Sequence, residues 1–203
     1  MNFRYKFSIV LIILGLISAI MSFGGKKSVS LEPEEILTLL LNGEFTLSAD
    51  ELAGLIIEQD SVLQIVDVRD PGKYKLLSIP GAVNIPLASL VEPVYETMLR
   101  EERMKTVFYS DDDILSNQAW MLSMQKGYRN VYMLKGGLID WDSIVLHSEF
   151  SGEKITAQEN ALFEKRYKAR RLFVQWNTMA DSLKAGFFLA KKKKDRELVG
   201  GCE

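Results

Sequence analysis

The side chains best placed to do chemistry lie in the stretch 105–116, which has the sequence KTVFYSDDDILS. It predicts a buried strand that ends at Tyr109, then a short loop, then a helix that begins near Ser116. In a parallel α/β sheet, the carboxyl end of such a strand is where ligands bind. A loop hydroxyl could attack a substrate if a base activated it, and clustered carboxylates could hold a hard cation or a basic protein segment. The candidate residues are Ser110, Asp111, Asp112, Asp113, Ile114, Leu115 and Ser116.

Other side chains suited to chemistry are few. The single histidine, His147, excludes a multi-histidine metal centre, and the single cysteine, Cys202, excludes an internal disulfide framework and a cysteine-based zinc site. Asp67 and Arg69 follow a second apolar strand and could either line a site or hold loops together as an ion pair. We predict neither a cofactor nor a metal site, and the net charge of −2 gives no case for nucleic-acid binding.

The elements that would position these residues alternate between short strands and helices. Residues 62–68, 83–85 and 131–133 predict further strands, the first of them apolar enough to be covered on both faces. A capping box at 48–51 predicts the start of one helix, and Gly127 predicts the end of the helix that follows the loop. This alternation predicts an α/β fold with a small central parallel sheet flanked by helices and joined by right-handed crossovers.

The first 27 residues predict a membrane anchor or a signal segment. The uncharged run 7–25 would span about 28 Å as a helix, close to the ~30 Å hydrocarbon core of a bilayer. It is longer than the apolar core of a usual signal and lacks a good cleavage site, which favours an uncleaved anchor. The flanking charges favour a single-pass protein whose domain is exported, as in the periplasm of a bacterial envelope. The alternative is secretion after cleavage; in either case 28–43 would form a linker and a short helix.

The C-terminal quarter predicts a helical extension over 148–190, in which a second capping box at 156–159 opens one long amphipathic helix. Its apolar face could pack on the domain or on a second copy, or it could lie on a membrane surface. Residues 154–203 hold twelve Lys or Arg residues against six Asp or Glu. Residues 191–203 predict a basic flexible tail with Cys202, which either has no role or carries a reactive thiol. The apolar positions of the extension are Leu162, Leu172, Phe173, Trp176, Met179, Leu183 and Phe187.

Over residues 44–147 the sequence resembles a rhodanese-like domain. The matching segments are IVDVRDP at 65–71, IPGAVNIP at 79–86 and GYRNVYMLKGG at 127–137, in the order and spacing of that family. The resemblance implies a small α/β domain whose active loop follows the fourth strand. In active members, that loop begins with a cysteine that carries sulfur as a persulfide, and backbone amides with an arginine hold the anionic substrate.

The chain departs from this pattern at each chemical position. By the resemblance, Ser110 stands at the cysteine, Leu115 at the usual arginine and Ser78 at a common histidine. A hydroxyl cannot form a persulfide, because sulfur transfer needs a polarizable thiolate. Three adjacent carboxylates would also repel an anion by about 1 kcal/mol per close pair in water. The same objections apply to the phosphatases that share the fold.

Three functions follow as hypotheses. The first is a membrane-tethered, catalytically inactive rhodanese-like domain that binds an unidentified protein partner through its loop and its basic tail. The second is a sulfur-relay or redox protein whose carrier thiol is Cys202. The third, ranked last, is an active thiosulfate sulfurtransferase that uses Ser110. Self-association through the C-terminal helix is a further expectation.

Overall fold

The computed structural model describes residues 12–14, 34, 38, 45–149 and 156–199, with side chains described up to residue 190 of the last range. Residues 12–14, 34 and 38 are helical. The rest of the predicted anchor, most of the 28–43 segment and Cys202 lie outside the described residues. Across the parts of the chain that are described, no helix is long and apolar enough to span a bilayer.

Five parallel strands form one sheet in the order β1-β5-β4-β2-β3. In the register of the central strands, Asp67 at the end of β2 pairs with Tyr109 at the end of β4. The segments that follow these two strands therefore leave the sheet side by side. The α/β fold and its parallel sheet are as predicted, except that β1 was missed. The strands are β1 (Thr46–Leu47), β2 (Leu63–Asp67), β3 (Ala82–Asn84), β4 (Lys105–Tyr109) and β5 (Val131–Leu134).

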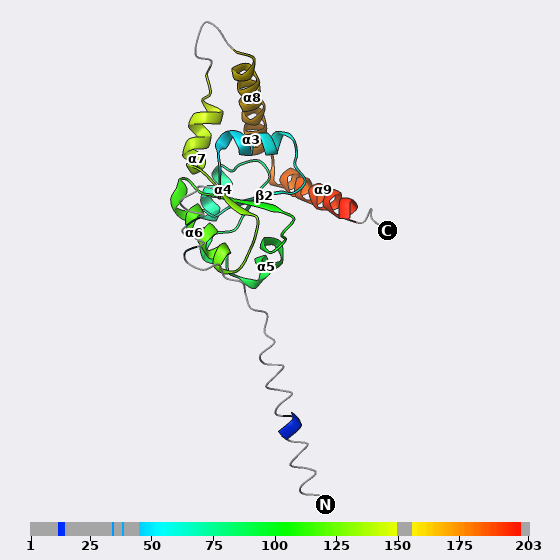
Figure 1. The fold of residues 1–203 in the computed structure, drawn as a ribbon. Coiled ribbons are helices and arrows are strands. Elements are labelled where there is room, and N and C mark those ends of the chain that lie inside the picture. Colours follow the sequence, from blue (N-terminus) through cyan, green and yellow to red (C-terminus); the bar gives the residue numbers. More distant parts are fainter. Residues whose placement is uncertain (1–11, 15–33, 35–37, 39–44, 150–155, 200–203) are drawn as a thin grey trace, which may run out of the picture.

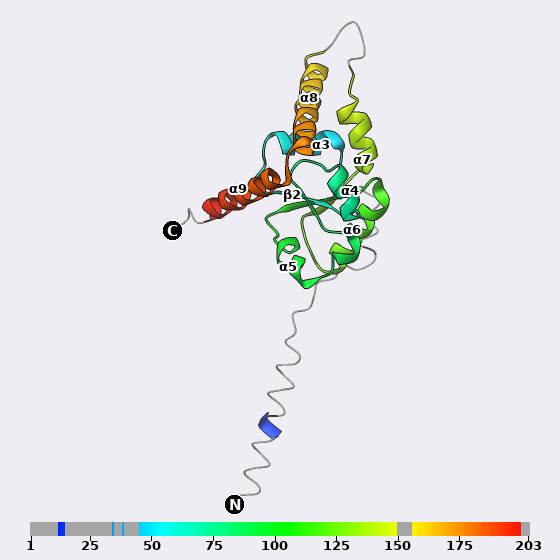
Figure 2. The same ribbon diagram turned by 180° about the vertical axis from the view of Figure 1, so that it is seen from behind.

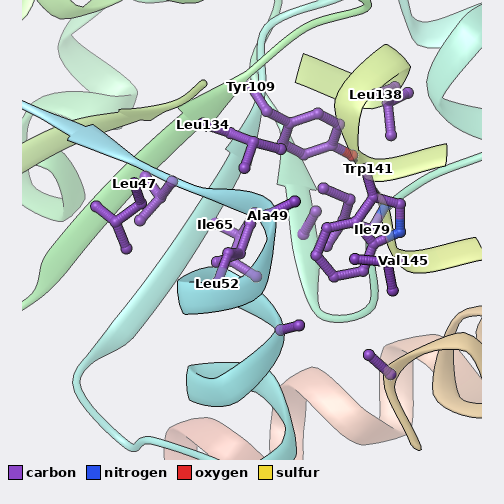
Figure 3. Close-up of a cluster of buried hydrophobic side chains, with 14 of the residues drawn as sticks. Leu47, Ala49, Leu52, Ile65, Ile79, Tyr109, Leu134, Leu138, Trp141 and Val145 are labelled. Atoms are coloured by element: carbon purple, nitrogen blue, oxygen red, sulfur yellow. Dashed lines mark hydrogen bonds between the residues drawn. The ribbon is translucent and has the colours of Figure 1, made fainter. Parts of the chain in front are cut away.

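Helices cover both faces of the sheet (Figure 1). On one face, α3 (Ala49–Ile57), the π-helical segment η2 (Trp141–Leu146) and α8 (Ala157–Thr178) enclose a core with Ile79, Tyr109 and Trp141 at its centre (Figure 3). On the other face, η1 (Leu87–Ser89), α5 (Pro93–Leu99) and α6 (Asp113–Gln125) enclose a second core around Phe108 and Trp120. Two short helices, α4 (Pro71–Leu76) and α7 (Gly137–Asp140), follow the carboxyl ends of β2 and β5.

The ends of the helices follow from local capping chemistry. The predicted box at the start of α3 is present, with the Ser48 hydroxyl accepting from the Glu51 N–H and the Glu51 carboxylate accepting from the Ser48 N–H. Gly127 follows Lys126, the C-cap residue of α6, and has φ +74°, a conformation that favours glycine. The prediction that α6 begins near Ser116 was wrong, because the helix begins at Asp113. The Asp112 side chain caps it by accepting from the Ile114 N–H, and aspartate is a preferred N-cap residue.

The C-terminal extension forms two helices rather than the single long helix that the apolar spacing indicated. The first, α8, packs on α3 and buries Ala169, Phe173 and Trp176. Its C-cap residue Met179 has extended backbone angles, and α9 (Asp181–Val199) then leaves in a new direction. In both Figure 1 and Figure 2, α9 projects from the body on the side opposite α6 and α7. The first half of the extension is therefore part of the domain core.

Candidate functional site

The segment that follows β4 is closed by its own hydrogen bonds. Ser110 is 1% exposed, and its hydroxyl donates to the backbone carbonyl of Asp112. The hydroxyl of Ser116, which is fully buried in the first turn of α6, donates to the same carbonyl over 3.2 Å. The Ser110 oxygen is therefore turned into the loop rather than outward.

The start of α7 covers the loop from the side of β5. The carbonyls of Ser110 and Asp111 accept hydrogen bonds from the N–H groups of Leu138 and Ile139, at 3.0 and 3.1 Å. Gly137, the residue before Leu138, has φ +56°. A Cβ atom at this position would come within 2.6 Å of the Ser110 carbonyl oxygen. Only glycine fits this close backbone approach. The glycine pair at 136–137 therefore allows α7 to seal the loop.

Asp111 bridges two cations at the mouth of the loop. Its carboxylate accepts from Arg69 Nη1 at 2.9 Å and from Lys73 Nζ at 2.6 Å. Partial burial opposes the charge on Asp111, but Lys73 and Arg69 outweigh it and lower the pKa of the carboxyl below its usual value. Both cations that face the loop are thus bound to a carboxylate of the chain itself.

The other two acids of the loop have separate structural partners. One carboxylate of this pair, Asp112, caps α6 through the Ile114 N–H at 2.9 Å, and the other, Asp113, accepts from the Gly136 N–H at 2.6 Å. The three carboxylates thus bind donors in three different places: Arg69 and Lys73, the first turn of α6, and Gly136 before α7. In the described ranges, no group of three His, Cys, Asp or Glu residues is arranged to hold a metal ion.

Asp67 and Arg69 form a buried ion pair beneath the loop. Asp67 is 0% exposed and accepts from Arg69 Nε and Nη2, the latter at 2.7 Å. Burial disfavours the Arg69 charge, but hydrogen bonds to Asp67 and Asp111 outweigh it and raise the pKa of the guanidinium. Arg69 Nη2 also donates to the Leu77 carbonyl at 2.6 Å. Burial, and then the adjacent Asp67 charge, raise the pKa of the Tyr109 phenol well above its ordinary value.

Ser78 lies in the turn before β3 and is 1% exposed. Its partners come from the end of α8: Trp176 Nε1 donates to the Ser78 hydroxyl at 3.0 Å, and the Asn177 side chain binds both backbone groups of Ser78 at 2.9 Å. Sequence reasoning did not find Lys73, Trp176 or Asn177 as neighbours of the site region. Lys73 lies on α4, a helix whose only signal was Asp70-Pro71 at its start, and the α8 residues are about a hundred positions from their partner.

Exposed apolar side chains lie on the segments that meet at the loop. Leu76 is 83% exposed, Ile114 63% and Ile139 64%. The backbones of these segments are joined there, because the Ile139 N–H binds the Asp111 carbonyl and Arg69 bonds to both Asp111 and the Leu77 carbonyl. His147 lies elsewhere, at the end of η2, with its side chain 72% exposed and beside Asp142. We define the loop-mouth patch as Leu76, Leu77, Ile114, Leu115 and Ile139.

A groove of about 380 Å³ lies at the opposite, amino-terminal edge of the strands. It runs between α3, the start of β2 and the two C-terminal helices. Its walls are mainly apolar, and no residue of the loop lines it. Lining residues include Leu55, Ile56, Leu63, Trp176, Met179 and Phe187.

Comparisons with known proteins agree with this architecture. The family described as "Rhodanese-like domain" matches residues 48–144. The human "Centrosomal protein of 41 kDa" is 32% identical over 85 residues, which are 39% of this chain but only 23% of that protein. The yeast (Saccharomyces cerevisiae) "Thiosulfate:glutathione sulfurtransferase" is 24% identical over 106 residues, covering 47% of this chain and 76% of that protein.

Among solved structures, the rhodanese-like domain of the Anabaena protein Alr3790 is 26% identical with a TM-score of 0.45, and the match covers 55% of this chain and 88% of that one. The chain spans about a quarter of the length of the centrosomal relatives that it matches. The assignment rests on the family match together with the strand order and the loop after β4. Residues 48–144 of this chain form a rhodanese-like domain.

Proposed function

We propose that this protein is a catalytically inactive rhodanese-like domain that works by binding a protein partner at its loop mouth. The observation that carries the proposal is the state of the loop after β4. The Ser110 hydroxyl is buried and bound to the Asp112 carbonyl, and the two nearby cations are bound to Asp111.

The chemistry of sulfur transfer explains why this arrangement favours inactivity. A persulfide forms on a thiolate sulfur, and a serine oxygen cannot take its place. A base that could activate the hydroxyl would have to lie within hydrogen-bond reach, but Ser110 donates to a backbone carbonyl instead. An incoming anion such as thiosulfate would also have to displace the Asp111 carboxylate from Arg69 and Lys73.

The loop mouth has the composition of a protein-binding surface. The loop-mouth patch consists of large exposed apolar side chains on segments whose backbones meet at the loop, and clustered exposed apolar residues commonly mark interaction sites. Asp111 pairs with Arg69 and Lys73, whereas Asp112 and Asp113 accept from backbone N–H groups, so the loop keeps an acidic surplus. By charge complementarity, the partner that fits is a protein segment with apolar side chains flanked by Lys or Arg.

Sulfur chemistry tests the inactivity. The purified full chain is exposed to a sulfane-sulfur donor, and persulfide is measured by intact mass beside a Cys202→Ser variant. We expect no sulfur on either chain. Thiosulfate:cyanide transfer that survives in Cys202→Ser would establish an active enzyme and refute the proposal. Sulfur that appears on the parent chain and is lost in Cys202→Ser would instead favour the relay function.

Site-specific crosslinking tests the binding. A photo-crosslinking amino acid is placed at Leu76 or Ile114, and a matched control is placed at Val94, which is 73% exposed on α5. We expect one adduct of the same mass at both loop-mouth positions, absent at the control and lost when Ile139→Asp is added. Adducts that form equally at Val94, or at neither loop-mouth position, would contradict the proposed surface.

We also propose that residues 7–25 anchor the protein in a membrane with the domain exported. The support is the length and uninterrupted apolar character of that run. Cell fractionation with protease protection tests this, and we expect a membrane-bound chain whose domain is cut by external protease in spheroplasts. A soluble exported protein that starts after residue 25 would replace the anchor by a cleaved signal.

A further inference from the structure

The end of α8 is bonded to the turn that precedes β3. Asn177 accepts from the Ser78 N–H and donates to the Ser78 carbonyl, both at 2.9 Å, so that one side chain satisfies both backbone groups of one residue. The Trp176 indole N–H donates to the Ser78 hydroxyl at 3.0 Å. Both Ser78 and Trp176 are buried, at 1% and 4% exposure. We call Ser78, Trp176 and Asn177 the α8 clamp.

The turn held by the clamp also positions the groups under the loop. Leu77, which precedes Ser78, presents its carbonyl to Arg69 Nη2 at 2.6 Å. Ile79, which follows Ser78, donates its N–H to the Tyr109 hydroxyl at 3.1 Å, and Tyr109 is the residue before Ser110. Asn177 is therefore connected to the loop in two ways through the turn at 77–79. One runs from Leu77 through Arg69 to Asp111, and the other runs from Ile79 through Tyr109 to Ser110.

We propose that the α8 clamp holds the loop in its closed conformation, so that displacement of the end of α8 loosens residues 110–116. The reason is that three partners hold the Arg69 guanidinium. Its Nη2 donates to Asp67 and to the Leu77 carbonyl, and its Nη1 donates to Asp111. If Leu77–Ile79 moves, Arg69 loses one anchor and its bond to Asp111 weakens. This proposal rests on the proposed binding function, because a loosened loop would change how the loop mouth binds a partner. The coupling between α8 and the loop can be measured without a partner.

The C-terminal helix α9 offers a point at which such a displacement could begin. Phe187 and Phe188 contact the Trp176 ring edge-on, with centroids 5.4 and 5.8 Å away, and Lys184 lies 5.5 Å from the centroid of that ring. Leu183 and Leu189 of the same helix are 63% and 70% exposed. A force or a ligand that moves α9 thus acts directly on the tryptophan of the clamp.

Hydrogen–deuterium exchange of the full chain tests the coupling. Asn177→Ala removes both bonds to the Ser78 backbone, and Thr178→Ala is the matched control, because the Thr178 hydroxyl bonds only to carbonyls of its own helix. With two bonds lost at about 1 kcal/mol each, we expect roughly thirtyfold faster exchange at 77–79 and 110–116 in Asn177→Ala. Exchange in these segments should stay unchanged in Thr178→Ala.

Two further variants keep the test decisive if Asn177→Ala unfolds. Trp176→Phe keeps an aromatic ring but loses the donor to Ser78, so the same segments should exchange faster by a smaller factor. Asp111→Asn tests reciprocity: a real coupling requires faster exchange at 175–180 when the loop is loosened. Faster exchange at 77–79 without a change at 110–116 would overturn the proposal. The sulfur and crosslinking results do not enter this readout, so the two proposals can fail separately.

Discussion

The hydroxyls and the N-cap residue of the loop after β4 bond locally, whereas the polar side chains at the end of α8 bond over a long sequence separation. In the loop, Ser110, Asp112 and Ser116 bond mainly within the same few residues. At the end of α8, Trp176 and Asn177 bond to a residue about a hundred positions away. The loop lies inside the matched rhodanese-like region and α8 lies outside it. The rhodanese-like region therefore supplies most of the sheet, and the C-terminal helix α8 completes the core on one face of it.

The difference has an energetic basis. Loop bonds over short sequence separations cost little chain entropy, whereas the α8 contacts must offset the ordering of a long connection. Burial supplies that free energy, because Ala169 and Phe173 join the core around Trp141 and Trp176 is buried against Ser78. Substitutions in α8 should therefore lower the free energy of unfolding more than substitutions in the loop.

The largest effect is expected from Trp176→Ala. This change removes a buried ring and leaves the Ser78 hydroxyl without the indole donor, so we expect a loss of about 3–5 kcal/mol in the free energy of unfolding. Urea unfolding of the full chain in a nonionic detergent measures it. Val174→Ala on the same helix, at 55% exposure, should cost less than about 0.5 kcal/mol. Equal losses for both variants would mean that α8 is not part of the core.

Asp67→Asn should come next, at about 3 kcal/mol, because it leaves the buried Arg69 charge without its main counter-ion. The same urea experiment measures the loss. The comparison variant is Glu96→Gln, which breaks an exposed pair with Arg100 and should change stability by less than about 0.5 kcal/mol. A neutral Asp67→Asn would show that the pair beneath the loop does not stabilise the fold.

Most of the sheet could be predicted from the sequence, but the partners of the site residues could not. Three motifs in register fixed the order of strands and helices, because apolar runs and Gly or Pro positions report local backbone geometry directly. Asp111, Asp112 and Asp113 look alike in sequence, but Asp112 caps its own helix, whereas Asp111 and Asp113 bind partners that tertiary structure brings to them. The two helices of the extension were predicted as one, since an apolar spacing does not mark a break such as the one at Met179.

Within the loop, Asp112→Ala should have a moderate effect. It removes the N-cap of α6, which typically costs about 1 kcal/mol, while the Asp112 carbonyl remains available to Ser110 and Ser116. Asp112→Ser keeps a capping oxygen and should recover most of the loss in the same unfolding measurement. If the serine variant were as unstable as the alanine variant, capping would not be the role of this side chain.

The smallest effect is expected from Asp111→Asn, and its signature is a pH dependence. The folded pKa of Asp111 is lowered, so its charge stabilises the fold at pH values above the unfolded pKa of about 3.9. That contribution is lost as pH falls through the lower, folded pKa. The carboxylate is 45% exposed and Lys73 59%, so solvent and salt screen the pair, and we expect at most about 1 kcal/mol.

The parent chain and Asp111→Asn should therefore differ in unfolding free energy between pH 5 and pH 7, and the difference should shrink as the pH falls below the unfolded pKa of about 3.9. A Lys73→Met variant in a double-mutant cycle separates the Lys73 share of this difference from the Arg69 share. A difference that persists unchanged at pH 3 would mean that Asp111 contributes through shape rather than charge. In that case the carboxylate could not be what binds the two cations of the loop mouth.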